Sequence, residues 1–228
     1  MIVVGFDTAT DDTAVGAASD GEILFERLIP PAEGRPRHAT ALLPEVERAA
    51  AAAGGWEAVD RLAVGVGPGS FTGLRIGIST ARALAASLDL PLAPVPTLAA
   101  LLRALAERWP DRRLLGALDA RRGEVFSTLQ EPGGEVAWPP FVATPAQLAE
   151  RLRALPEAPL AAGSGAVRFR EELAGAGAEV PAGSDPLHRI AGRHVCGIGA
   201  GVEAFEPEAV EPIYLRPPDA ERWRDRQS

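Results

Sequence analysis

The stretch AVGVGPGSFTGLRIGIST, residues 63–80, joins an apolar strand to a helix through a Gly-Pro-Gly turn. The helix is predicted over 71–88, and glycine recurs in it at four-residue spacing, at Gly73 and Gly77. A glycine inside a helix costs roughly 1 kcal/mol relative to alanine, so this row needs a physical reason. Three interpretations stay open: close packing against the chain's own sheet, an anion bound at the first turn, or close approach of a helix from another chain.

On both sides of this stretch, hydrophobic periodicity and turn residues predict the same order of elements twice. The first copy has strands over 2–6, 13–19, 22–29 and 61–67 and helices over 38–53 and 71–88. The second has strands over 113–119, 123–130 and 135–138, a strand with a glycine turn over 159–165, and helices over 144–155 and 166–177. An extended piece over 91–96 and a helix over 97–109 lie between them, and Thr97 and Thr144 are predicted N-caps.

Each copy ends its first strand on an aspartate, Asp7 in GFDTAT and Asp119 in ALDARR. This plan resembles the duplicated actin-like ATPase (ASKHA) fold, an α/β architecture of two βββαβα lobes with mixed sheets. The resemblance implies a first lobe over 1–104 and a second over 105–228. The sequence leaves open whether the final helix, expected over 186–200, and the tail pack back on the first lobe.

In that fold class a nucleotide lies between the lobes, and the first hairpin of each lobe holds its phosphates. The resemblance places such a site at Asp7, Thr8, Thr10, Asp119, Gly163 and Gly165. Neither hairpin has a glycine directly after its aspartate, although backbone amides need that space to approach phosphate oxygens. Asp11 and Asp12 would also repel a phosphate. We therefore predict a vestigial nucleotide site and no cofactor.

The composition of the chain and the spacing of its histidines argue against several classes of function. The 228 residues carry a formal net charge of −8, which argues against non-specific nucleic-acid binding by the chain alone. The single cysteine, Cys196, and the lack of a long apolar run lead us to expect a cytoplasmic protein that does not enter a membrane. The histidines His38, His188 and His194 lack the spacing of a metal-binding pair, and Ser70 and Ser79 have no histidine base within motif reach. We predict neither a metal site nor a catalytic residue.

The segments GPGSFTGLRIG, FDTAT, LDARRGEVF and EPIYLR make the chain similar to the bacterial TsaB (YeaZ) family from residue 2 to about residue 216. That resemblance implies a non-catalytic subunit that supports the transferase TsaD in forming N6-threonylcarbamoyladenosine at position 37 of tRNAs reading ANN codons. It also implies the ATPase TsaE as a partner, contact with tRNA only through the complex, and a homodimer when the chain is alone. The alternative is an ATP-using enzyme of the actin-like class with Asp7 and Asp119 beside magnesium.

The resemblance also favours the partner-helix interpretation of the glycine row, because family members pair through the two helices of the first lobe. We expect the helices over 38–53 and 71–88 to present an apolar face that only another chain covers. The residues predicted for this face are Leu42, Leu43, Val46, Ala50, Gly73, Leu74, Gly77, Ile78 and Ala81.

Overall fold

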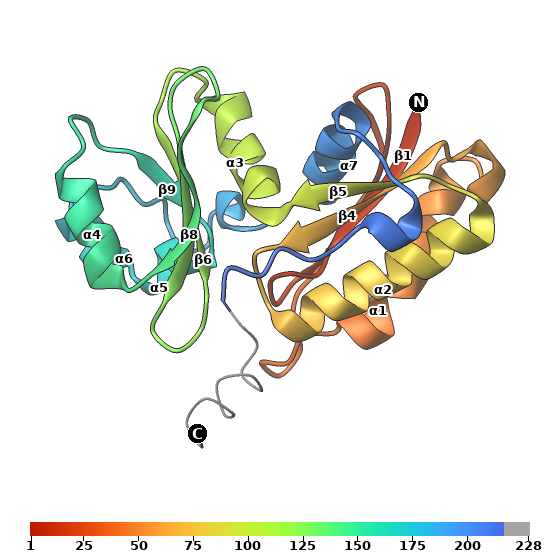
Figure 1. Cartoon of the computed structure of the whole chain (residues 1–228), viewed down its shortest axis with the longest axis horizontal. Coiled ribbons are helices and arrows are strands. Elements are labelled where there is room, and N and C mark those ends of the chain that lie inside the picture. The colour runs from red at the N-terminus through yellow and green to blue at the C-terminus, as the bar shows by residue number, and fades with distance from the viewer. Residues whose placement is uncertain (217–228) are drawn as a thin grey trace.

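The computed structural model describes residues 1–216 and contains two sheets that lie next to each other (Figure 1). The first sheet has the strand order β3-β2-β1-β4-β5. Its strands are β1 (Ile2–Asp7), β2 (Thr13–Ser19), β3 (Glu22–Ile29), β4 (Arg61–Gly67) and β5 (Leu92–Pro96). Because β1 pairs antiparallel with β2 but parallel with β4, the sheet is mixed, as the sequence predicts.

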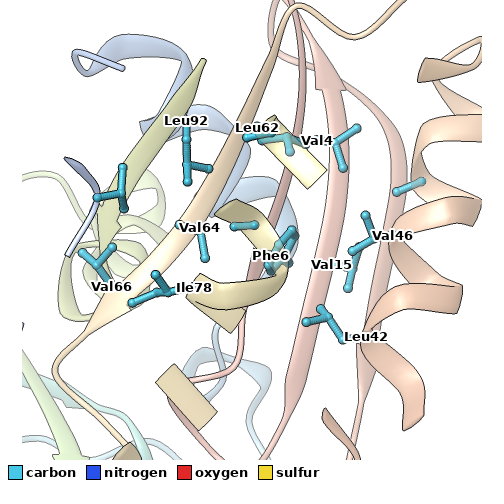
Figure 2. Close-up of a cluster of buried hydrophobic side chains, with 14 of the residues drawn as sticks. Val4, Phe6, Val15, Leu42, Val46, Leu62, Val64, Val66, Ile78 and Leu92 are labelled. Atoms are coloured by element: carbon cyan, nitrogen blue, oxygen red, sulfur yellow. The ribbon is translucent and has the colours of Figure 1, made fainter. Parts of the chain in front are cut away.

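Helices cover both faces of the first sheet (Figure 1). One face carries α1 (His38–Ala52) and α2 (Phe71–Leu88), and the other carries α7 (Gly192–Gly201). Figure 2 shows the core under α1 and α2, in which Val15 of β2 lies beside Leu42 of α1. The apolar stripes of the two long helices therefore face their own sheet.

The second sheet has the order β8-β7-β6-β9. Its strands are β6 (Leu114–Asp119), β7 (Val125–Gln130), β8 (Val136–Ala143) and β9 (Leu160–Ala162). One face carries α4 (Pro145–Arg153), α5 (Ser164–Arg168) and α6 (Arg170–Gly175), and the other carries α3 (Thr97–Arg108). Three short 3-10 helices complete the described part: η1 (Trp56–Ala58), η2 (Pro186–His188) and η3 (Pro207–Ala209). The βββαβα order occurs in both halves, which confirms the predicted duplication.

The elements of the second half differ from the prediction at three places. The third strand, β8, continues to Ala143 instead of ending at residue 138. The helix expected over 166–177 is two helices separated at Phe169, whose ring packs into the core of this half. The final helix expected over 186–200 is η2 followed by α7, because Ile190 between them is buried in an apolar cluster shared by both sheets. Among residues 1–216, no helix combines the length and apolarity needed to cross a bilayer.

The two predicted N-caps have different outcomes. Thr144 caps α4 in a capping box, in which its hydroxyl accepts from the Gln147 backbone amide and the Gln147 side chain accepts from the Thr144 amide. Thr97 does not cap α3, because Pro96 takes the N-cap position and the Thr97 hydroxyl is bonded elsewhere in the interior. A tertiary hydrogen bond thus overrides a local signal at Thr97.

The final helix packs back on the first sheet. A Cβ added to Gly192 would lie 2.2 Å from the carbonyl carbon of Val15, and one added to Gly16 would lie 2.6 Å from the carbonyl carbon of Gly192. The backbones of α7 and β2 therefore touch, and a side chain at either glycine would separate them.

We predict that Gly192→Ala lowers the free energy of unfolding by about 1–3 kcal/mol, because the added methyl group overlaps backbone that cannot yield cheaply. Gly197→Ala, in the same helix, is the matched control. Its Cβ would meet only the Arg103 guanidinium, at 3.8 Å, so this change should stabilise the chain by roughly 0.5–1 kcal/mol. Urea unfolding of both variants measures the difference. Equal stability of the two would show that α7 does not press on β2.

Candidate functional site

A cavity of about 650 Å³ opens where the two halves meet. Its walls include the β1–β2 hairpin (8–12), the β6–β7 hairpin (120–124), the first turn of α2 and the segment 213–216. This is the place where the predicted nucleotide site would lie, so the position of each expected residue decides what the cavity can hold.

Asp7 points away from the cavity into the protein. Its carboxylate is buried and accepts two hydrogen bonds, from the Ala9 amide at 2.7 Å and from the Thr97 hydroxyl at 2.7 Å. The same Thr97 oxygen accepts from the Gly67 amide at 3.1 Å. Gly65 makes room for the group, since a Cβ there would lie 1.9 Å from Asp7 Oδ2. Burial raises the pKa of Asp7, and the two hydrogen bonds oppose that shift.

The glycine row of α2 packs against the chain's own first hairpin. A Cβ on Gly73 would lie 2.0 Å from the carbonyl oxygen of Thr8, and one on Gly77 would lie 2.3 Å from the Thr8 hydroxyl. That hydroxyl donates to the Gly73 carbonyl at 2.8 Å. Of the three interpretations of this row, packing within the chain therefore accounts for both glycines. The surface they pack against is the β1–β2 hairpin, whereas the prediction named the sheet.

The exposed apolar face predicted on α1 and α2 is not present in the described part of the structure. All the predicted residues except Leu43 are buried within the chain: Leu42, Val46, Ala50, Gly73, Leu74, Gly77, Ile78 and Ala81. Figure 2 shows Leu42, Val46 and Ile78 in the core with Val15 and Phe6. The helical period identifies the apolar stripe, but the stripe covers the sheet. Leu43, which follows Leu42 at the edge of this stripe, is 49% exposed.

The aspartate of the second hairpin, Asp119, is also hydrogen-bonded to other groups of the chain. Asp119 accepts from the Arg121 amide at 2.8 Å and from Arg168 at 2.7 Å, while its own amide donates to the Ser164 hydroxyl. The glycines of the following turn fit against β6: a Cβ on Gly163 would lie 2.1 Å from the Ala117 carbonyl oxygen, and Gly165 is similarly confined. Of the six predicted nucleotide positions, Thr10 and Asp119 line the cavity, and Asp7, Thr8, Gly163 and Gly165 do not.

The charged and aromatic residues around the cavity were not predicted from the sequence. Two arginines that line the cavity pair with acidic groups, Arg121 with Asp11 and Arg216 with Glu124. Arg189, which follows the lining residue His188, pairs with the lining residue Asp12. Phe71 packs against Tyr214 with ring centroids 5.3 Å apart, and the Arg75 guanidinium lies 4.1 Å from the Phe71 centroid. The only local signal was the pair of opposite charge doublets, Asp11-Asp12 and Arg121-Arg122, in equivalent hairpins.

The three histidines lie in separate surroundings. His38 Nδ1 bonds the Thr13 hydroxyl at 2.8 Å, His188 Nδ1 accepts from the Gly163 amide, and His194 Nε2 lies 3.2 Å from Glu107. Burial lowers the pKa of His38 and of His194. Within residues 1–216, no group of three or more His, Cys, Asp or Glu side chains is placed to hold a metal ion.

Comparisons with known proteins identify relatives of this chain. The family model of TsaD, tRNA N6-adenosine threonylcarbamoyltransferase, matches residues 28–155. The tRNA threonylcarbamoyladenosine biosynthesis protein TsaB of Escherichia coli is 36% identical over 127 residues, 55% of this chain and 53% of that protein. The chain thus spans about half the length of the curated relatives it matches.

Solved structures extend the likeness over the whole described fold. YeaZ from Pseudomonas aeruginosa is 27% identical with a TM-score of 0.76, covering 94% of this chain and 99% of that one. The ethanolamine utilization protein EutJ from Carboxydothermus hydrogenoformans, 13% identical with a TM-score of 0.51 over 87% of this chain and 90% of that one, shares the fold alone. These matches and the two mixed sheets confirm the duplicated actin-like fold.

The buried carboxylate yields a pH prediction. Because the pKa of Asp7 is raised in the folded chain above the ordinary 3.8, the stability contributed by this group is complete below that value and is lost as pH rises through the folded-state pKa. Asp7→Asn cannot ionise, so its free energy of unfolding relative to the native chain should increase as pH rises from about 4 to about 8. Urea unfolding across that range checks the trend, with Asp111→Asn, at an exposed position, as the charge control. A difference that stays flat or falls with pH would contradict the prediction.

Proposed function

This chain belongs to the TsaD family and, within it, to the TsaB (YeaZ) group, and on that premise we propose that it is a non-catalytic subunit that binds and supports TsaD. The supported reaction forms N6-threonylcarbamoyladenosine at position 37 of tRNAs reading ANN codons. The observation that carries the non-catalytic role is the state of Asp7, whose two carboxylate oxygens are both bonded inside the chain. A catalytic acid or base must come within hydrogen-bond reach of the reacting group, whereas Asp7 is buried and does not line the cavity.

The alternative, an ATP-using enzyme, receives less support. It would need Asp7 and Asp119 to face a shared metal and nucleotide, yet Asp7 is buried and Asp119 is paired with Arg168. Asp11 and Asp12 pair with Arg121 and Arg189, so these two arginines already have anionic partners within the chain. The net charge of −8 fits a chain that reaches tRNA only through its complex. We include TsaE among the proposed partners and place the complex in the cytoplasm, where a lone thiol stays reduced.

The proposed docking surface is the outer side of α1 and α2. Leu43 is the one large apolar side chain of α1 that the described fold leaves substantially exposed. On α2, Ile76 and Leu84 are only partly buried. We propose that TsaD covers this side in the cell and that a second copy covers it in the isolated chain. The proposed docking surface thus lies on the exposed flank of the same two helices and not on their buried stripe.

The docking proposal predicts that Leu43→Glu weakens capture of TsaD by roughly tenfold or more and shifts the isolated chain toward monomer, because a charge would be buried at the contact. Val136→Glu, at a similarly exposed apolar residue on β8, is the control and should leave both unchanged. Pull-down titrations and sedimentation measure the two effects. Normal binding and self-association by folded Leu43→Glu would place the docking surface elsewhere.

The role in modification predicts that the isolated chain neither hydrolyses ATP nor modifies tRNA, and that tRNA modification by TsaD rises when the chain is added. The measurements are ATP turnover with magnesium and formation of the modified adenosine with and without this chain. ATP turnover that is lost in folded Asp7→Asn would instead establish the enzyme alternative. Modification by TsaD that is indifferent to this chain would exclude the supporting role.

A further inference from the structure

Carboxylates of the chain itself bridge the cavity between the two halves. Arg121, on the β6–β7 hairpin, donates to Asp11 Oδ1 on the β1–β2 hairpin at 2.5 Å. Arg189, which follows η2, donates through Nε to Asp12 Oδ2 at 2.8 Å and through Nη2 to Asp12 Oδ1. Both acceptors come from the β1–β2 hairpin. Arg121 lines the cavity from the β6–β7 hairpin, and Arg189 directly follows His188, which also lines it.

Each side of this contact is anchored in its own half of the molecule. The β1–β2 hairpin is held to the first turn of α2, because the Ser70 amide donates to the Ala9 carbonyl at 2.7 Å. On the other side, His188 accepts from the Gly163 amide at 3.2 Å, which fastens η2 and hence Arg189 to the second sheet. The ion pairs therefore join two fixed bodies and not two loose loops.

A guanidinium group binds a carboxylate and a phosphate through the same fork of N–H donors. With Asp11 and Asp12 in place, Arg121 and Arg189 already have anionic partners. Asp11 also raises the pKa of Arg121, as expected for a close ion pair. We propose that Asp11 and Asp12 are internal anionic ligands of the cavity, which hold its rim closed and keep phosphate-bearing molecules away from Arg121 and Arg189.

The burial of the pairs indicates how this closure would respond to salt. The side chains of Arg121 and Asp11 are 60% and 40% exposed, and those of Arg189 and Asp12 are 39% and 13% exposed, so the Arg121–Asp11 pair is the more accessible to salt. Exposed pairs are individually weak and are screened when the Debye length falls from about 10 Å at 0.1 M salt to about 3 Å at 1 M. The apolar cluster that contains Leu118 and Phe126 joins the halves behind the cavity, so we expect opening at the rim only.

The first test compares Asp11→Asn/Asp12→Asn with a control that removes the same charge, Asp20→Asn/Glu26→Gln. The control residues pair with the N-terminus and with Arg193, away from the cavity. Spin labels at Ala39→Cys and Glu150→Cys, exposed on α1 and α4, report the distance between the halves. Cys196 does not compete for the label, because burial raises its thiol pKa to about 12.

At 0.1 M salt the Asp11→Asn/Asp12→Asn distance should be longer than that of the native chain, and the control should match the native chain. Raising the salt to 1 M should lengthen the native distance toward that of the variant, a test that needs no substitution at the ion pairs. Equal distances in all four samples, or an equal shift in the control, would overturn the closure.

The second test measures binding of inorganic pyrophosphate by titration calorimetry. The native chain and the control should give no binding heat, while Asp11→Asn/Asp12→Asn should bind, and adding Arg189→Gln to that variant should abolish the binding. Failure of the double variant to gain pyrophosphate binding, with its circular dichroism unchanged, would refute the exclusion of phosphate. Equal binding by the native chain would refute it as well.

Discussion

The buried carboxylate of Asp7 is the contact on which the arrangement of the two halves depends. It joins the end of β1 to the start of α3 through Thr97, and Thr97 in turn holds the Gly67 amide at the end of β4. Burying a charged group is costly, and hydrogen bonds from Ala9 and Thr97 offset that cost. Because α3 begins the passage to the second sheet, the same carboxylate fixes the first hairpin and the direction in which the chain leaves the first lobe.

This use of Asp7 explains why the cavity keeps the outline of a nucleotide site without its chemistry. The hairpins still face each other, but Asp7 is turned inward and Asp119 is bonded to Arg168. The glycines that would admit a phosphate instead admit other parts of the protein: Thr8 against α2, and Ala117 against the turn after β9. The glycines still allow close backbone contacts, but the contacting atoms belong to the chain itself and not to a phosphate.

Local signals predicted the first half of the fold well. The bounds of β2, β3, β4 and α2 agree with the prediction, because Asp20 and Gly21 adopt the positive φ of a tight turn and Ser70 caps α2. The site was harder, since Arg189 lies 177 residues from Asp12 and no local pattern joins them. A helical period likewise tells which stripe is apolar, but not whether a sheet or another protein covers it. That limit led to the exposed face wrongly predicted for Leu42 and Val46.

The contact of α7 with the first sheet has a consequence for synthesis. The sheet is assembled from residues 2–96, but the helix that covers one of its faces ends at Gly201. On the ribosome, Val3 and Ala63 therefore stay open to water until nearly the whole described chain has emerged. A fragment ending at residue 104 would carry this bare face permanently. The first lobe is begun early in translation and finished only after the second has been made, so the two halves mature as a single unit.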